Sequence, residues 1–176
     1  RVIAELAGRH LKPVLLELGG KAPLVVLDDA DIDGAVNAAV FGAFMNQGQI
    51  CMSTERIIVV ESVADAFIEK FAAKARSLTV GDPREGKTPL GAVIDRKTVD
   101  HVNSLIDDAV AKGASVAAGG KGDSVLMPAT VVTGVTSQMD LYRDESFGPV
   151  VAVMRARDEE QAIELANDSQ YGLSAA

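Results

Sequence analysis

The chain has 176 residues, of which 48% are apolar, with one cysteine, no tryptophan and a formal net charge of −8. This length suits one globular domain with a sizeable core, and a single cysteine excludes an intramolecular disulfide framework or a Cys-rich metal site. The acidic balance, without a Lys/Arg run, argues against a nucleic-acid partner. No apolar stretch approaches the roughly 20 residues of a membrane span, and no leader opens the chain. We therefore expect a soluble, cytoplasmic protein that binds neither nucleic acid nor membranes.

Helices and strands are predicted to alternate along the chain. Apolar spacing, β-branched runs, prolines and acidic caps set the expected boundaries. The expected elements are a helix ending before Pro13, strands over 14–18 and 24–27, a helix capped by Asp31, a strand over 57–60, helices over 63–78 and 95–112, strands over 115–117, 129–132 and 150–154, and a helix over 158–167.

This alternation, with several strands apolar on both faces, predicts an α/β fold with a mostly parallel sheet covered by helices. No repeat or linker divides residues 1–176, so we expect one domain. The chain begins at Arg1 inside an expected helix and stops just after Tyr171-Gly172-Leu173. We therefore expect it to be a segment of a longer protein, truncated at both ends.

Cys51 is the first candidate for chemistry, because it lies in a loop between a helix and a strand. A thiol is mostly protonated at neutral pH, so a nucleophilic cysteine needs a nearby base, cation or helix N-terminus. Free cysteines are also among the most buried residues. The residues alone leave both a nucleophile and a core residue open for Cys51.

Glu17 is the second candidate, since it interrupts an apolar run and is followed by two glycines. It either faces water on an edge strand or is a carboxylate poised to accept a proton. In the second case Gly19 and Gly20 would permit a ligand or another backbone to approach closely.

Glu145 and Phe147 form the third candidate, in an acidic turn that ends in Gly148-Pro149. The turn is either an exposed surface feature or the wall of a pocket lined by the Phe147 ring. His10 and His101 are expected to be surface residues. With so few possible ligands, we expect no metal site.

Three motifs in order resemble those of the NAD(P)-dependent aldehyde dehydrogenase superfamily. They are Glu17-Leu18-Gly19-Gly20-Lys21-Ala22-Pro23, Asn46-Gln47-Gly48-Gln49-Ile50-Cys51, and Glu145-Ser146-Phe147-Gly148-Pro149. The resemblance extends over the whole chain and implies a three-layer catalytic domain. Residues 1–13 would then be the end of a preceding cofactor-binding domain.

The resemblance also implies the role of each residue. Cys51 would attack the aldehyde and form a thiohemiacetal and then a thioester, and its backbone amide would supply half of an oxyanion hole. Glu17 would be the general base. The residues implied in binding NAD or NADP are Leu18, Gly19, Glu145 and Phe147.

The family's dinucleotide-binding domain is not among these residues, so this segment alone is expected to be inactive. The parent is expected to be a homo-oligomer, a dimer or a tetramer. Glu17 favours hydrolysis of the thioester over transfer to coenzyme A. Two alternatives stay open: a CoA-acylating dehydrogenase, and a non-catalytic domain with a core cysteine. Residues 49–56 resemble members that act on aromatic aldehydes such as salicylaldehyde, vanillin or benzaldehyde.

Overall fold

A five-stranded sheet forms the centre of the molecule in the computed structural model, which describes residues 1–86 and 88–176. The strands lie in the order β1-β2-β5-β4-β3, and only β3 runs antiparallel to its neighbour. Their bounds are Ala22–Val26 for β1, Thr54–Val60 for β2, Ser115–Ala118 for β3, Thr130–Thr133 for β4 and Val150–Ala156 for β5. The mostly parallel sheet predicted from the sequence is confirmed.

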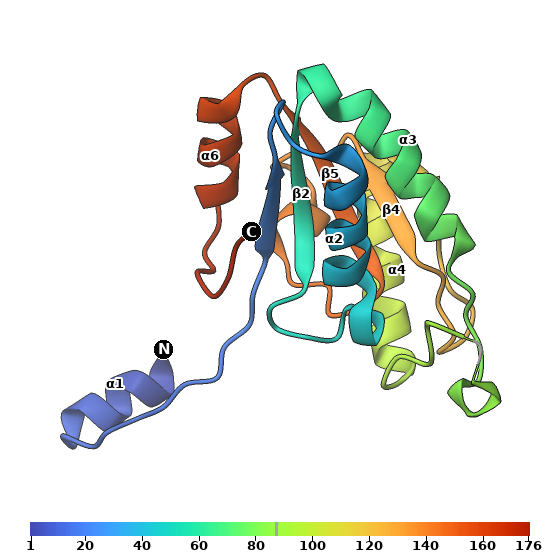
Figure 1. The fold of residues 1–176 in the computed structure, drawn as a ribbon. Coiled ribbons are helices and arrows are strands. Elements are labelled where there is room, and N and C mark those ends of the chain that lie inside the picture. Colours follow the sequence, from blue (N-terminus) through green and yellow to red (C-terminus); the bar gives the residue numbers. More distant parts are fainter. Residues whose placement is uncertain (87) are drawn as a thin grey trace.

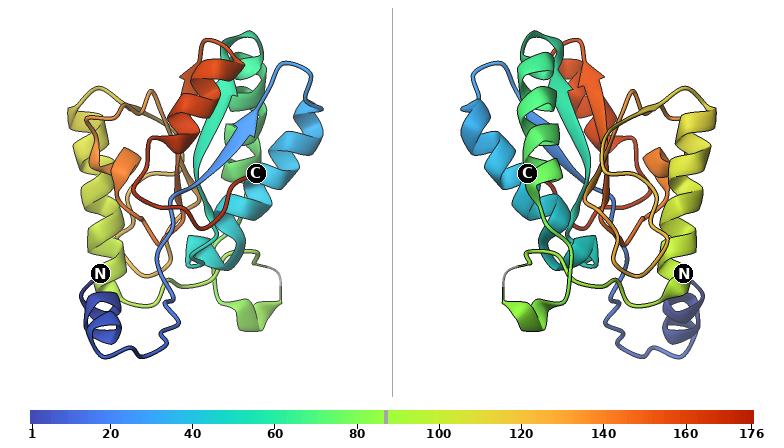
Figure 2. Two further views of the ribbon diagram at one scale, coloured as in Figure 1. Left: turned by 90° about the vertical axis from the view of Figure 1, so that its left-hand side faces the viewer. Right: turned by 90° about the vertical axis from the view of Figure 1, so that its right-hand side faces the viewer.

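Helices cover both faces of this sheet and make three layers (Figures 1 and 2). Helices α2 and α3 pack on one face, and α4, α5 and α6 pack on the other. The helix bounds are α1 Val2–Arg9, α2 Ile32–Phe44, α3 Glu61–Ser77, α4 Arg96–Ala111, α5 Asp140–Arg143 and α6 Glu159–Asn167, with short 3₁₀ turns η1 Met45–Gly48 and η2 Pro83–Glu85. The predicted helices are therefore present, with ends displaced by a few residues.

The apolar residues of β2 show why a buried parallel strand needs no alternation of polar and apolar residues. Ile57 and Val59 belong to the core shared with α2 and α3, whereas Ile58 belongs to the core on the opposite side. Both faces of the strand are covered, so a continuous β-branched run is stable there.

Acidic residues cap three of the described helices, and two of these caps, Asp31 and Asp158, were predicted. Asp31 accepts a hydrogen bond from the Asp33 amide at 3.2 Å. Asp95 and Asp158 accept from amides three residues further along their helices, each at 2.9 Å. Each cap satisfies a backbone donor that the first helical turn leaves free.

The strand predicted over residues 14–18 is wrong. These residues are extended but exposed, and no strand is assigned to them. An apolar run becomes a strand only when a neighbouring edge accepts its backbone hydrogen bonds, and this run leads away from the sheet. It connects β1 to α1, which stands apart from the three layers in Figure 1 and contains no buried residue.

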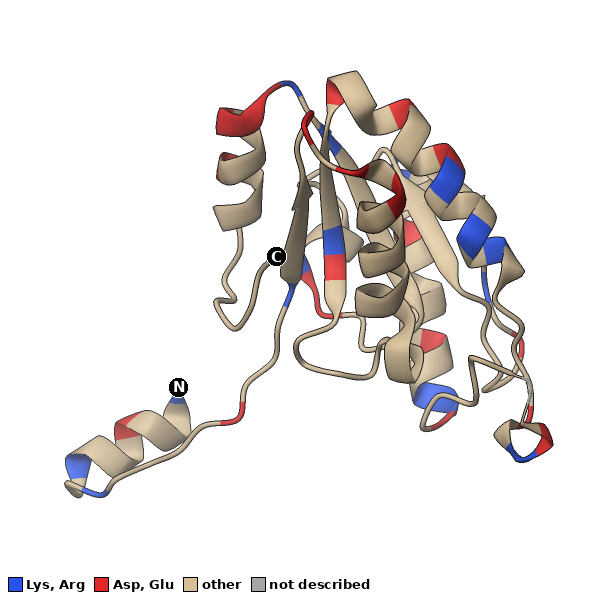
Figure 3. Ribbon diagram, in the orientation of Figure 1, with Lys and Arg blue, Asp and Glu red and all other residues tan. Residues whose placement is uncertain are grey.

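Charged residues lie mainly on helices and loops, and the strands are largely uncharged (Figure 3). The exceptions are Glu55 and Arg56, which are adjacent at the beginning of β2, and Arg155 near the end of β5. None of the described helices has the length and hydropathy that a membrane crossing requires.

Candidate active site

The three motifs converge because each one directly precedes a strand of the same parallel group. Residues 17–21 lead into β1, residues 46–51 precede β2, and residues 145–149 lead into β5. These strands are neighbours in the order β1-β2-β5 and run parallel. The segments before them therefore meet at one edge of the sheet, the edge where these strands begin.

Two glycines allow the segments to touch. A Cβ atom on Gly20 would overlap the carbonyl oxygen of Cys51, and one on Gly19 would lie 2.7 Å from Glu145 Oε2. Any larger residue would push these groups apart. The close approach expected at Gly19 and Gly20 is present, and its partners are the other two motifs.

The loop before Cys51 has an unusual backbone. Asn46 and Gln47 have φ of +51° and +58°, and Gly48 follows at +69°. Residues other than glycine rarely adopt this left-handed backbone conformation. A Cβ atom on Gly48 would also overlap the carbonyl oxygen of Gly148, so this glycine meets both a conformational and a spatial requirement. The loop is thereby fixed against the turn that leads into β5.

The two predicted catalytic residues differ in exposure. Cys51 is half-buried and forms no disulfide, in the loop between η1 and β2. Glu17 is exposed and therefore faces water, although not on the edge strand that one interpretation assumed. Together with Leu18 and Gly19 it lines a groove of about 530 Å³, whose opposite wall comes from residues 170–173.

Phe147 lies in a separate hollow. The residue is 39% exposed and lines a depression of about 400 Å³ together with Gln47, Gln49 and Ile94. Gln49 Oε1 accepts a hydrogen bond from the Ile94 amide at 2.8 Å, which holds the cysteine loop against the residues before α4. The structure thus places the candidate cofactor-binding residues in two neighbouring hollows rather than in one.

Glu145 lies between these hollows. Its Oε1 accepts a hydrogen bond from the Gly20 amide at 2.8 Å, and its backbone oxygen lies 3.0 Å from His101 Nε2. The contact with His101 was not predicted. The carboxylate is partly exposed, and its Oε2 lies so close to Gly19 that a Cβ atom there would be only 2.7 Å away. Among the described residues, no hydrogen-bond donor to Oε2 is found, so this oxygen can still accept one.

The sequence also did not predict a buried ion pair next to the motifs. Lys21 Nζ lies 2.6 Å from Glu55 Oε2, and the two residues are 2% and 3% exposed. Burial lowers the pKa of Lys21, and the charge of Glu55 opposes that shift. Glu55 also accepts hydrogen bonds from the amides of Ser146 at 2.8 Å and Phe147 at 3.2 Å.

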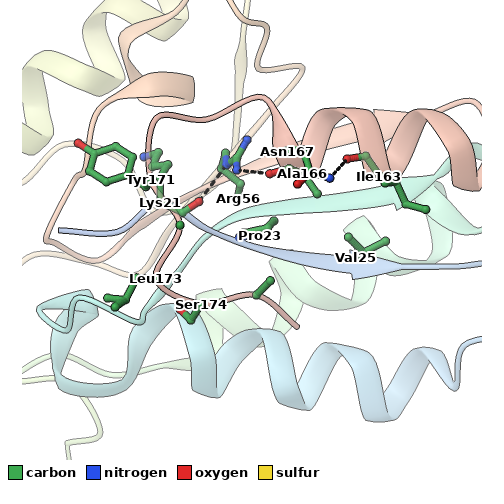
Figure 4. Close-up of a pocket in the computed structure, with 12 residues that line it drawn as sticks. Lys21, Pro23, Val25, Arg56, Ile163, Ala166, Asn167, Tyr171, Leu173 and Ser174 are labelled. Atoms are coloured by element: carbon green, nitrogen blue, oxygen red, sulfur yellow. Dashed lines mark hydrogen bonds between the residues drawn. The ribbon is translucent and has the colours of Figure 1, made fainter. Parts of the chain in front are cut away.

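Arg56 extends this network to the far side of β1. Its guanidinium donates to the carbonyl oxygen of Lys21 at 3.1 Å and to those of Leu165 and Ala166 at 2.9 Å each, as Figure 4 shows in part. The cation thus binds the carbonyl end of α6, where the helix dipole favours positive charge. Figure 4 also shows the hollow of about 470 Å³ that it helps to line.

Tyr142 packs against the same cation, with its ring centroid 5.6 Å from the Arg56 guanidinium carbon. Its hydroxyl donates to Asp168 Oδ2 at 2.8 Å. Burial and this hydrogen bond raise the pKa of Tyr142 to about 12, so the hydroxyl remains a donor at neutral pH. No group of three or more His, Cys, Asp or Glu that could hold a metal occurs in the described part of the chain.

The comparisons with known proteins identify the family. A family model described as the aldehyde dehydrogenase family matches residues 1–176. The chain belongs to the aldehyde dehydrogenase family, and the resemblance inferred from the three motifs is confirmed.

The most similar relatives include enzymes named for aromatic aldehydes. The chain is 56% identical over 176 residues to vanillin dehydrogenase from Pseudomonas fluorescens, covering 100% of this chain and 36% of that protein. It is 45% identical over 175 residues to benzaldehyde dehydrogenase [NAD(+)] from Pseudomonas putida, covering 99% of this chain and 36% of that protein.

Solved structures confirm the fold class. The crystal structure of a salicylaldehyde dehydrogenase from Pseudomonas putida G7, complexed with salicylaldehyde, superposes with a TM-score of 0.93 at 50% identity. The match covers 99% of this chain and 36% of that chain. The chain therefore spans only about a third of the length of the relatives that it matches.

Proposed function

We propose that the protein carrying this chain is an NAD(P)-dependent, non-acylating dehydrogenase that oxidises an aromatic aldehyde to its carboxylate. The observation that carries the proposal is the convergence of the Glu17, Cys51 and Glu145 segments through contacts at Gly19 and Gly20. A nucleophile, a base and a sugar-binding carboxylate at one sheet edge are the groups that this chemistry requires.

The chain's own residues would divide the reaction between them. The Cys51 sulfur would add to the aldehyde carbon and form a thiohemiacetal, with the backbone amide of Cys51 donating to the developing oxyanion. Bound NAD(P)⁺ would supply the hydride acceptor that converts this adduct to a thioester. The exposed carboxylate of Glu17 would then take a proton from the water that hydrolyses the thioester.

The residues around Glu145 fit the ribose of that cofactor. In the part of the chain that the structure describes, only Oε1 of the carboxylate accepts a hydrogen bond, and a diol would donate to Oε2. Leu18 and Gly19 line one of the two hollows, and Phe147 lines the other. The name of the benzaldehyde relative specifies NAD, which supports a nicotinamide cofactor in this protein.

Further proposals concern the parent protein. Residues 1–13 would belong to the end of a cofactor-binding domain, which agrees with the position of α1 apart from the three layers. The segment alone would be inactive, since the remaining cofactor contacts would come from that domain. The parent would be a cytoplasmic homo-oligomer, in a compartment that keeps Cys51 reduced.

The experiment that tests this function is an assay of the parent with vanillin, salicylaldehyde and benzaldehyde. We expect NAD(P)H formation at 340 nm that does not require coenzyme A, together with the carboxylate product. A requirement for coenzyme A would instead support the acylating alternative. Failure to oxidise any of these aldehydes, with short aliphatic aldehydes as the comparison, would contradict the aromatic assignment.

Glu145→Gln is expected to weaken cofactor binding while leaving the thiol chemistry intact. The amide keeps the size of the side chain but removes the charge that accepts hydrogen bonds from a diol, so we expect a loss of about tenfold in cofactor affinity. Cofactor titration and pre-steady-state NAD(P)H formation measure this loss, and iodoacetamide labelling of Cys51 is the control. If cofactor affinity and the rate of hydride transfer are both unchanged, Glu145 is only part of an exposed acidic turn.

A further inference from the structure

Glu55 joins two of the three motif segments, the one before β1 and the one before β5, although it belongs to neither. We propose that Glu55 is a positioning residue whose carboxylate fixes the Ser146–Phe147 turn and thereby places Glu145 and Phe147 for cofactor binding. The cofactor part of this inference rests on the proposed function. The structural part, that Glu55 holds the turn, does not.

The contacts of Glu55 are unusually complete for a buried carboxylate. Its Oε2 meets Lys21 Nζ at 2.6 Å and the Ser146 amide at 2.8 Å, while Oε1 meets the amides of Ser146 at 3.0 Å and Phe147 at 3.2 Å. A buried charge is tolerated only when it is paired and hydrogen-bonded in this way. One side chain therefore satisfies two consecutive backbone donors and one buried ammonium group.

The turn needs such a partner because its backbone is strained. Phe147 has a φ of +47°, in the left-handed region that residues with side chains rarely adopt. Its ring is partly exposed, so packing of the ring alone does not fix this conformation. The two amides bound to Glu55 are the contacts that hold the turn against relaxation.

The position of Glu145 depends on the same contacts. Glu145 immediately precedes the bound amides, and its carboxylate accepts the Gly20 amide at 2.8 Å. Gly20 in turn precedes Lys21, the ion-pair partner of Glu55. The turn is thus tied to the segment before β1 twice, once through the backbone of Gly20 and once through the side chain of Lys21.

Glu55 could instead serve only to neutralise Lys21, and the two roles are separable by mutation. Glu55→Leu combined with Lys21→Met removes both charges, so no unpaired ion is buried, but it also removes the acceptor for the two amides. Lys21→Met alone keeps that acceptor. A purely structural role predicts that the double variant recovers fully, whereas a positioning role predicts that it recovers only stability.

The test compares Glu55→Gln, Lys21→Met and the double variant in the parent protein, with Glu61→Gln as the matched control. Glu61 is an exposed glutamate just after β2, paired with Arg155 at 2.7 Å and remote from the turn. We expect Glu55→Gln and the double variant to bind NAD(P)⁺ about tenfold or more weakly, because charge-assisted hydrogen bonds are lost. Lys21→Met and the control should change affinity less, and iodoacetamide labelling of Cys51 should stay within about twofold of the parent rate.

Hydrogen exchange gives a readout that does not depend on enzyme activity. Peptides covering residues 141–150 should exchange faster in Glu55→Gln and in the double variant than in the parent and the control. If a single variant fails to fold, the uncharged double variant still decides the question. Parent-like exchange and cofactor affinity in the double variant would overturn the inference. A parent that oxidises no aldehyde would contradict the proposed function, while the exchange result would still show whether Glu55 holds the turn.

Discussion

Replacing Cys51 with alanine is expected to lower aldehyde oxidation by the parent protein at least about 10³-fold, because no covalent adduct can form without the sulfur. Cys51 is the chain's only cysteine, so no second thiol of this segment can substitute for it. Steady-state NAD(P)H formation measures the loss, and mass spectrometry after a single turnover tests for the acylated cysteine in the parent.

The matched control is Met52→Ala, which alters the adjacent residue. Met52 is 61% exposed and follows the cysteine in the same loop. We expect its replacement to change turnover by much less than the loss of the sulfur. Cofactor affinity in Cys51→Ala should equal that of the parent, which separates lost chemistry from lost binding. If the variant retains a tenth or more of the parent rate, the result would favour the alternative in which Cys51 is a core residue without a catalytic role.

Glu17→Gln is expected to lower turnover by roughly 10²- to 10⁴-fold, the range typical of losing a general base. The amide keeps the size of the side chain but cannot take a proton from water. If Glu17 serves thioester hydrolysis, the first turnover should still release NAD(P)H as a burst, and only the later turnovers should be slow. Stopped-flow absorbance separates these two phases.

Glu5→Gln provides the control for Glu17, since Glu5 is an exposed carboxylate on α1. Neither substitution should change the melting temperature, because neither side chain is buried. A missing burst would assign Glu17 to activation of the thiol rather than to hydrolysis. An unchanged steady-state rate, under conditions where hydrolysis limits turnover, would remove it from the catalytic residues.

The fold was largely predictable because its signals are local. Apolar periodicity and the caps at Asp31 and Asp158 predicted the helices, and β-branched runs predicted the buried strands. The error over residues 14–18 has a clear origin: an apolar run favours burial, but it does not show that a neighbouring strand is there to pair with it. Only the arrangement of the whole sheet supplies that information.

The sequence predicted the candidate site residues but not the buried residues that hold them in place. The motifs name Glu17, Cys51 and Glu145, yet nothing local indicates that β1, β2 and β5 would be neighbours. Glu55 and Arg56 lie outside the strand predicted over residues 57–60, and the sequence predicted no role for them. The sequence feature that could have revealed them is a pair of opposite charges next to an otherwise apolar strand. Such charges can be buried only when other segments supply partners for them. Those partners lie 34 or more positions away along the chain.

The separate position of α1 has a consequence for handling this polypeptide. Its apolar residues Val2, Ile3 and Leu6 are exposed, and the extended segment after it exposes Leu11 and Leu15 as well. Soluble monomers rarely leave so many neighbouring apolar side chains in water. At high concentration, the 176 residues produced alone would therefore self-associate through this surface, and shortening the polypeptide to begin near Gly19 would improve its solubility.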